Sequence, residues 1–112
     1  DMVFDCRFLR NPYWDEALRT LTGLDAAVQE YVMADPMYPG FEAKVQDLTT
    51  SLLPAFVNEG KSHLTVAFGC TGGKHRSVTT AQRCALALEE AGWQVSIVHR
   101  DLSQHERGEA AA

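Results

Sequence analysis

The sequence predicts an α/β domain of three layers, in which a small, mostly parallel sheet lies between helices. Three short segments have the pattern of strands, Met2–Phe8, His63–Phe68 and Trp93–Val98, because they are apolar or alternate with a period of two. Apolar residues at helical spacing fill the stretches between them. Since strands and helices alternate, right-handed crossovers are expected to join parallel strands. The 112 residues suffice for one such core and are too few for two.

The first predicted strand carries two charges among apolar residues. Every second side chain from Met2 to Phe8 is apolar, whereas the opposite side carries Asp5 and Arg7. These two residues can form an ordinary ion pair at a strand end or belong to a binding site. Asn11-Pro12 then ends the strand.

Helices are predicted between the strands. Trp14–Leu21 has the pattern of a short helix, and Asp25 that of the N-cap of a second one. A third apolar stripe runs from Phe41 to Phe56, and Pro54 is expected to kink or end that helix. A fourth helix follows a glycine-rich segment and stops at Gly92.

Composition and charge restrict the class of protein. Hydrophobic residues make up 46% and charged residues 22% of the chain, as in an ordinary globular domain, and no apolar run approaches a membrane span. The net charge of −5 opposes broad binding to a polyanion. Three cysteines, an odd number without a CxxC pair, argue against a disulfide framework and a zinc site. We therefore expect no metal, no cofactor and a reducing, cytoplasmic location.

The chain is expected to form one domain over residues 1–102, followed by a polar, alanine-rich tail over 103–112 that is disordered. It opens at Asp1 directly before a predicted strand, without the basic segment of a signal peptide. We therefore expect a piece of a longer protein, with a further domain upstream.

The glycine-rich segment 69–77, called the loop below, carries the clearest functional signal. It reads Gly-Cys-Thr-Gly-Gly-Lys-His-Arg-Ser and joins a predicted buried strand to a helix. In open α/β sheets ligands bind beyond the carboxyl ends of the strands, and a helix N-terminus attracts anions through its free N–H groups and dipole. Lys74 and Arg76 add positive charge, while Thr71 and Ser77 offer hydroxyl donors. The sequence therefore predicts a site for an oxyanion of phosphate size.

A nucleotide-binding P-loop does not fit this segment. The Walker A pattern GxxxxGK[ST] requires a glycine where Phe68 stands, and a serine or threonine where His75 stands. The loop is therefore not predicted to belong to a P-loop NTPase.

A cysteine phosphatase remains an alternative. The loop fits the pattern CxxGxxR[ST], in which Cys70 would be the nucleophile and Arg76 would bind the phosphoryl oxygens. Gly69 stands where that class usually has histidine, and the candidates for a general acid are Asp5 and Asp101. A buried, loop-shaping role for Cys70 is the other interpretation.

The segment Gly69–Val78 resembles the signature of the C-terminal domain of the RapZ/YvcJ family. Agreement extends over residues 4–12, 22–25 and 99–100, so the resemblance covers about residue 3 to residue 102. It implies a full protein with an N-terminal P-loop domain that binds ATP or GTP. It further implies a non-enzymatic C-terminal domain that senses glucosamine-6-phosphate and binds small regulatory RNA, acting as an adapter for a ribonuclease. Members assemble as oligomers partly through this domain, so a homo-oligomer is expected. A purely structural module that oligomerises the nucleotide-binding domain is a third hypothesis for its function, beside the regulatory domain and the phosphatase.

The resemblance also implies which residues contact the ligand, with Asp5 and Arg7 facing the loop from the first strand. Tyr13 stands where members that bind the amino-sugar phosphate often have histidine, and the tail is close to neutral where the best-known members have a basic one. The expected ligand-binding residues are Asp5, Arg7, Tyr13, Cys70, Thr71, Gly72, Gly73, Lys74, His75, Arg76 and Ser77. The expected RNA-binding residues are Lys74, Arg76, His99 and Arg100.

Overall fold

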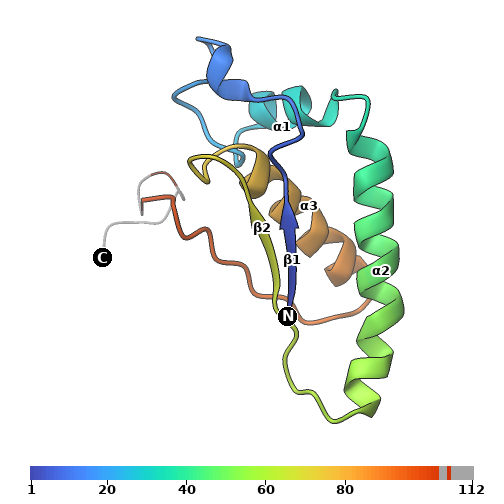
Figure 1. The fold of residues 1–112 in the computed structure, drawn as a ribbon. Coiled ribbons are helices and arrows are strands. Elements are labelled where there is room, and N and C mark those ends of the chain that lie inside the picture. The colour runs from blue at the N-terminus through green and yellow to red at the C-terminus, as the bar shows by residue number, and fades with distance from the viewer. Residues whose placement is uncertain (104–105, 107–112) are drawn as a thin grey trace.

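A computed structural model describes residues 1–103 and 106 (Figure 1). Two strands pair in parallel, with Met2 opposite Val66 and Asp5 opposite Gly69, which confirms the predicted α/β class. In chain order the elements are β1 (Met2–Asp5), the short 3-10 helix η1 (Pro12–Trp14), α1 (Ala26–Met33), α2 (Tyr38–Asn58), β2 (Val66–Gly69) and α3 (Arg76–Glu90).

The helices pack against one face of the sheet. Phe4 and Phe68 stack on that face with ring centroids 5.6 Å apart, and Phe4 also meets Phe41 of α2 edge-on. Figure 1 shows α3 behind the strands and α2 alongside them. Because α1, α2 and α3 all contact one another, they lie on the same side, and Val3 on the opposite face is 78% exposed. The second covering layer that we expected is not formed by residues 1–103 and 106.

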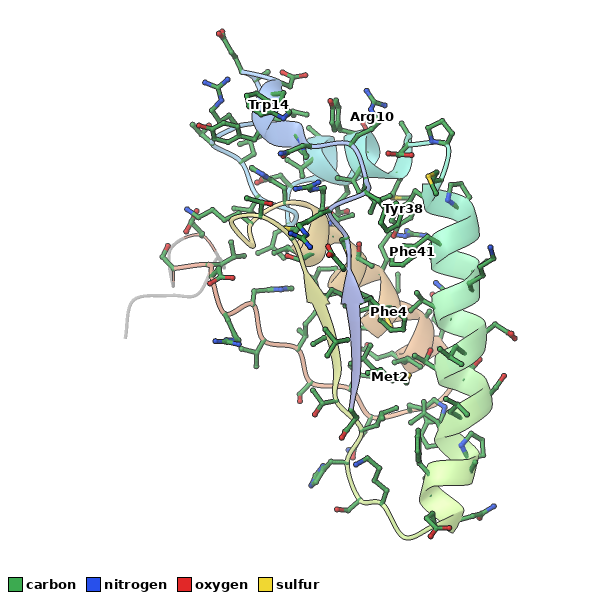
Figure 2. All side chains as sticks on the ribbon, viewed as in Figure 1. Met2, Phe4, Arg10, Trp14, Tyr38 and Phe41 are labelled. Carbon is green, nitrogen blue, oxygen red and sulfur yellow. The ribbon has the colours of Figure 1, made fainter. Side chains whose placement is uncertain are left out.

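The core lies between the end of β1 and the first two helices. Leu9 and Leu18 from the N-terminal segment pack there with Val28 and Val32, which are fully buried on α1. Tyr38 begins α2 and closes this cluster, and Figure 2 shows its side chain beside Phe41. An ion pair between Arg83 of α3 and Glu42 of α2, 2.6 Å between Nε and Oε1, holds these helices together.

β1 ends sooner than the alternating pattern predicts. Past Asp5 the backbone turns, because the Arg7 N–H donates to the Asp5 carboxylate at 2.9 Å and the Leu9 N–H donates to the Cys6 carbonyl at 3.2 Å. These local bonds replace the ladder that a strand reaching Phe8 would need. β2 likewise begins at Val66, where its pairing with β1 begins, and not at His63.

The third predicted strand is not formed. Residues 93–98 carry no strand assignment, and a groove of about 710 Å³ separates β2 and α3 from the segment 95–101. The alternating sequence of Trp93–Val98 is compatible with extended backbone, but a strand also needs hydrogen bonds to a neighbouring strand, and the sheet contains only β1 and β2 in the described residues.

The structure confirms some of the predicted helices and contradicts others. α1 begins directly after Asp25, as predicted, and the backbone at Gly92 has a φ of +96° just after α3. Pro54 does not end α2, which continues to Asn58. Its last turn is closed by the Glu59 N–H, which donates to the Ala55 carbonyl at 3.1 Å. The prediction of a helix over 14–21 is wrong: the Asp15 side chain accepts the Ala17 N–H, and this segment forms η1 and consecutive turns.

No helix in the described part of the chain is long and apolar enough to cross a membrane. The predicted tail falls largely on 104–105 and 107–112, which lie outside the described residues.

Candidate functional site

The loop joins the carboxyl end of β2 to the start of α3. β2 ends at Gly69 and α3 begins at Arg76, the arrangement that the sequence predicts. Gly72 and Gly73 have φ values of +80° and +66°, the left-handed region that glycine adopts without steric cost. The loop backbone therefore depends on these two glycines, while Gly69 does not adopt a positive φ.

Cys70 caps the first turn of α3. The Ser77 N–H donates to Cys70 Sγ at 3.3 Å, and the Cys70 thiol donates to Ser77 Oγ at 3.2 Å. One of the N–H groups at the helix N-terminus is thus satisfied by sulfur. Cys70 is partly buried and links the beginning of the loop to the helix that follows it.

The N-terminal segment packs against the start of α3. His75 is buried, and its Nε2 lies 2.8 Å from the Leu21 carbonyl oxygen. The Gly23 N–H donates to the Lys74 carbonyl at 2.8 Å, and a Cβ on Gly23 would come within 2.5 Å of the His75 carbonyl oxygen and the Thr79 nitrogen. The sequence analysis gave Gly23 no role of its own. Its place in one of the stretches that resemble the RapZ/YvcJ family was the available signal.

Arg76 lies inside the protein. It is only 4% exposed, and its Nη1 donates to the carbonyls of Arg7 at 2.7 Å and Leu9 at 3.0 Å. Its Nε is buried without a hydrogen-bond partner among the described residues. Arg76 therefore fastens α3 to the turn after β1, and its charge lies beneath the loop.

Asp5 and Arg7 form an exposed ion pair at the end of β1. Their closest atoms, Arg7 Nη2 and Asp5 Oδ2, are 2.6 Å apart, and both side chains are more than half exposed. Hydrogen bonds from the Arg7 side chain and backbone lower the pKa of Asp5 from 3.8 to about 2, and Arg76 adds a smaller electrostatic effect. The same pair raises the pKa of Arg7. Because Asp5 is opposite Gly69, this pair lies at the start of the loop.

Acidic residues from the C-terminal segment lie against the loop. A Cβ built on Gly73 would overlap with the Asp101 carboxylate, so the two residues are in direct contact. Lys74 Nζ pairs with Glu106 Oε2 at 3.1 Å, and hydrogen bonds from Ser103 and Lys74 lower the pKa of Glu106. Sequence reasoning considered Asp101 only as a phosphatase acid and did not include Glu106. The exposed lysine of the loop is therefore already paired with a carboxylate.

The remaining predicted residues lie in different surroundings. Tyr13 belongs to η1, where its ring meets Trp14 edge-on at 5.4 Å and lies 4.8 Å from the Arg19 guanidinium carbon. Figure 2 shows Trp14 at the end of the molecule beyond the loop. Thr71 and Gly72 are exposed within the loop, so they are accessible to a ligand.

The predicted RNA-binding residues divide between surface and interior. Lys74 and Arg100 are exposed, whereas Arg76 and His99 are buried. The described part of the chain contains no group of three or more His, Cys, Asp or Glu residues placed to hold a metal ion.

Comparison with known proteins shows the family of this chain. The profile of the RapZ C-terminal domain matches residues 1–103. The chain belongs to the RapZ C-terminal domain family. The match covers β1, β2, the loop and the helices of the described part of this RapZ C-terminal domain.

Relatives with the same domain are named nucleotide-binding proteins. One from Ruegeria sp. (strain TM1040) is 63% identical over 102 residues, which are 91% of this chain and 34% of the relative. Those from Ruegeria pomeroyi and Cereibacter sphaeroides (strain ATCC 17025) are 60% and 57% identical over 104 residues, which are 93% of this chain and 37% and 34% of the relatives. The chain therefore spans about a third of the length of these relatives.

Proposed function

We propose that this RapZ C-terminal domain is a regulatory domain that binds a phosphorylated small molecule at the loop. The observation that carries the proposal is the strand–loop–helix geometry: β2 ends at Gly69, Gly72 and Gly73 turn with positive φ, and α3 begins at Arg76. N–H groups at the start of a helix and the helix dipole both favour a bound anion.

The charge beneath the loop supports an anionic ligand. Arg76 is buried and its Nη1 bonds only to neutral carbonyls, and none of the ion pairs formed by the described residues includes it. A guanidinium whose charge is not cancelled by a direct partner attracts anions to the surface above it. Arg76 thus contributes through its field and by shaping the loop.

The ligand proposed is an amino-sugar phosphate such as glucosamine-6-phosphate. Thr71 is exposed in the loop and offers a hydroxyl donor for phosphate, and Lys74 offers an ammonium group. At the end of β1, Asp5 has a pKa lowered to about 2, so it is ionised at neutral pH and supplies a carboxylate for the amine of the sugar. The site then has separate positions for a negative and a positive group of one small molecule.

Calorimetry tests this proposal with the purified protein. Glucosamine-6-phosphate is expected to bind, and glucosamine without the phosphate is not. Lys74→Ala should weaken binding by about tenfold, the usual effect of losing one charged hydrogen bond, whereas Lys44→Ala, an exposed lysine on α2, should not. Equal binding of both sugars would contradict a phosphate site.

RNA and a ribonuclease are proposed as macromolecular partners of the domain, acting as a homo-oligomer in the cytoplasm. This part rests on the family alone, and the net charge of −5 makes RNA binding dependent on a local patch. Arg100 and Lys74 are the exposed candidates. RNA binding is tested by fluorescence anisotropy with a small RNA. The affinity of Arg100→Ala is compared with that of the control variant Lys44→Ala.

A cysteine phosphatase is the second candidate. Cys70 favours it because its sulfur accepts the Ser77 N–H at the helix N-terminus, where a phosphatase nucleophile would lie. The commitment of Arg76 Nη1 to two backbone carbonyls opposes it, because the phosphoryl oxygens would need that guanidinium. We propose that the domain is not an enzyme. This proposal would be overturned if the protein hydrolysed an aryl phosphate and the Cys70→Ser variant did not.

A further inference from the structure

Cys6 and Cys70 are direct neighbours across the two strands. At the start of the sheet, the Met2 N–H donates to the Thr65 carbonyl at 3.0 Å, and Met2 lies opposite Val66, the residue after Thr65. The Cys6 N–H donates in the same way to the Gly69 carbonyl at 2.7 Å. By the same parallel pattern, Cys6 lies opposite the residue after Gly69, which is Cys70.

The two side chains point to the same helix. The Cys6 thiol donates to Thr80 Oγ1 at 3.7 Å, and the Cys70 thiol donates to Ser77 Oγ at 3.2 Å. Ser77 and Thr80 are three residues apart on α3, so they lie about 5–6 Å from each other on one helix face. The two sulfur atoms are therefore held side by side against the first turns of α3.

The spacing of the strands suits a disulfide bond. Adjacent strands lie roughly 4.7–4.9 Å apart, within the Cα separations of about 4.4–6.8 Å that disulfides span. Cys70 also has an electrostatic effect on the pKa of Cys6, as expected of neighbouring thiols. Both cysteines are free in this structure.

Their accessibility differs. Cys70 is partly exposed where the loop begins, whereas Cys6 is fully buried, and burial raises the pKa of its thiol to about 11. An oxidant from solvent therefore reaches Cys70 first. Cys84, the third cysteine, is buried farther along α3.

We propose that Cys70 is an oxidation site, and that Cys6 resolves the oxidised sulfur to form a disulfide bond between β1 and the loop. A hydroperoxide is the oxidant. The Cys70 sulfur attacks the peroxide, an S–O bond forms, the O–O bond breaks, and the thiol proton passes to the leaving oxygen, giving a sulfenic acid and an alcohol, or water from hydrogen peroxide. The Cys6 sulfur then attacks the sulfenic sulfur, the S–O bond breaks, and the thiol proton leaves with the hydroxyl group as water. Two sulfur atoms are oxidised and one peroxide is reduced.

Peptide mapping tests the proposal. The purified protein is treated with hydrogen peroxide, alkylated and digested with trypsin, which separates the three cysteines because cleavage follows Arg7, Lys61, Lys74 and Arg83. The expected product joins the peptide ending at Arg7 to the peptide of residues 62–74, with a mass lower by two hydrogen atoms than the free peptides together. Dithiothreitol should restore both thiols.

Matched variants identify the order of events. Cys84→Ser should form the linked product as the wild type does. Cys6→Ala should form none, and its Cys70 should instead be trapped by dimedone as the sulfenic acid. The proposal is overturned if peroxide oxidises Cys84 or makes disulfides between molecules while Cys6 and Cys70 stay unlinked. It is also overturned if neither residue reacts. No phosphate ligand is needed, so this result is independent of the ligand proposal.

Discussion

The Asp101 carboxylate lies where a Cβ on Gly73 would stand, so that no side chain fits at this position. Gly73 also has a positive φ, +66°, and it lies in the middle of the loop. The C-terminal segment thus places a negative charge next to the backbone that we propose binds phosphate. A ligand has to share this space with Asp101, and the loop has to keep a glycine there.

Gly73→Ala is predicted to destabilise the protein more than Gly72→Ala. Both positions have positive φ, which costs an alanine about 1–2 kcal/mol. At Gly73 the new Cβ also overlaps with Asp101, whereas nothing lies within 4 Å of a Cβ at Gly72, so Gly73→Ala should cost about 1 kcal/mol more. Urea unfolding measures the difference. An equal loss at both positions would contradict the contact with Asp101.

Gly23→Ala is predicted to separate the N-terminal segment from α3. Its Cβ would lie 2.5 Å from the backbone of His75 and Thr79, which cannot move away without disturbing the helix. We expect a loss of about 3 kcal/mol in the free energy of unfolding.

Gly40→Ala is the matched control for Gly23→Ala. Gly40 lies within α2 and has no atom within 4 Å of a built Cβ, so alanine should stabilise the helix by up to about 1 kcal/mol. Denaturant unfolding of both variants gives the comparison. Similar stability of the two would show that Gly23 does not pack against the start of α3.

Arg76→Ala is predicted to unfold more easily than Lys74→Ala. The Arg76 side chain holds the carbonyls of Arg7 and Leu9, and its loss leaves both groups without a partner, at a cost of about 3 kcal/mol. The pair between Lys74 and Glu106 is exposed, and its loss should cost less than about 1 kcal/mol. Thermal unfolding at matched pH distinguishes the two. If Arg76→Ala unfolded like the wild type, the bonds from Arg76 to the turn after β1 would not stabilise the fold.

The carboxyl group of Asp5 is predicted to titrate near pH 2. The pKa of Asp5 in the folded protein, about 2, lies below the ordinary value of 3.8. The ion pair therefore stabilises the fold above about pH 4, and this stabilisation is lost as the pH falls through the folded pKa. Carbon NMR of the Asp5 carboxyl group should show the low midpoint in the wild type and a return toward 3.8 in Arg7→Gln. A midpoint near 4 in the wild type would mean that the pair does not form in solution.

The sequence was sufficient for the features that depend on local order. Gly72 and Gly73 turn with positive φ because only glycine does so without cost, and α3 begins at Arg76, just before the apolar stripe that starts at Val78. The parallel pairing of β1 with β2 follows from the helices that separate them along the chain. These features need no knowledge of distant contacts.

Features that depend on distant contacts could not be predicted. Arg76 was expected to contact the ligand, whereas its burial depends on two backbone carbonyls near the other end of the chain. The segment 93–98 has the composition of a strand, yet it lies across the groove from β2 and does not pair with it. The exposed outer face of the sheet likewise depends on which side the helices pack.

Amide NMR of the labelled protein during titration with glucosamine-6-phosphate tests the central proposal most directly. The predicted result is that the amide resonances of Gly72, Gly73 and Lys74 shift with added ligand and that glucosamine alone leaves them unchanged. Asp101→Asn should lower the ligand concentration needed for half of the shift, because a competing negative charge is removed from Gly73. Resonances that stay in place across residues 70–77, or that shift only elsewhere in the domain, would contradict a phosphate site at the loop.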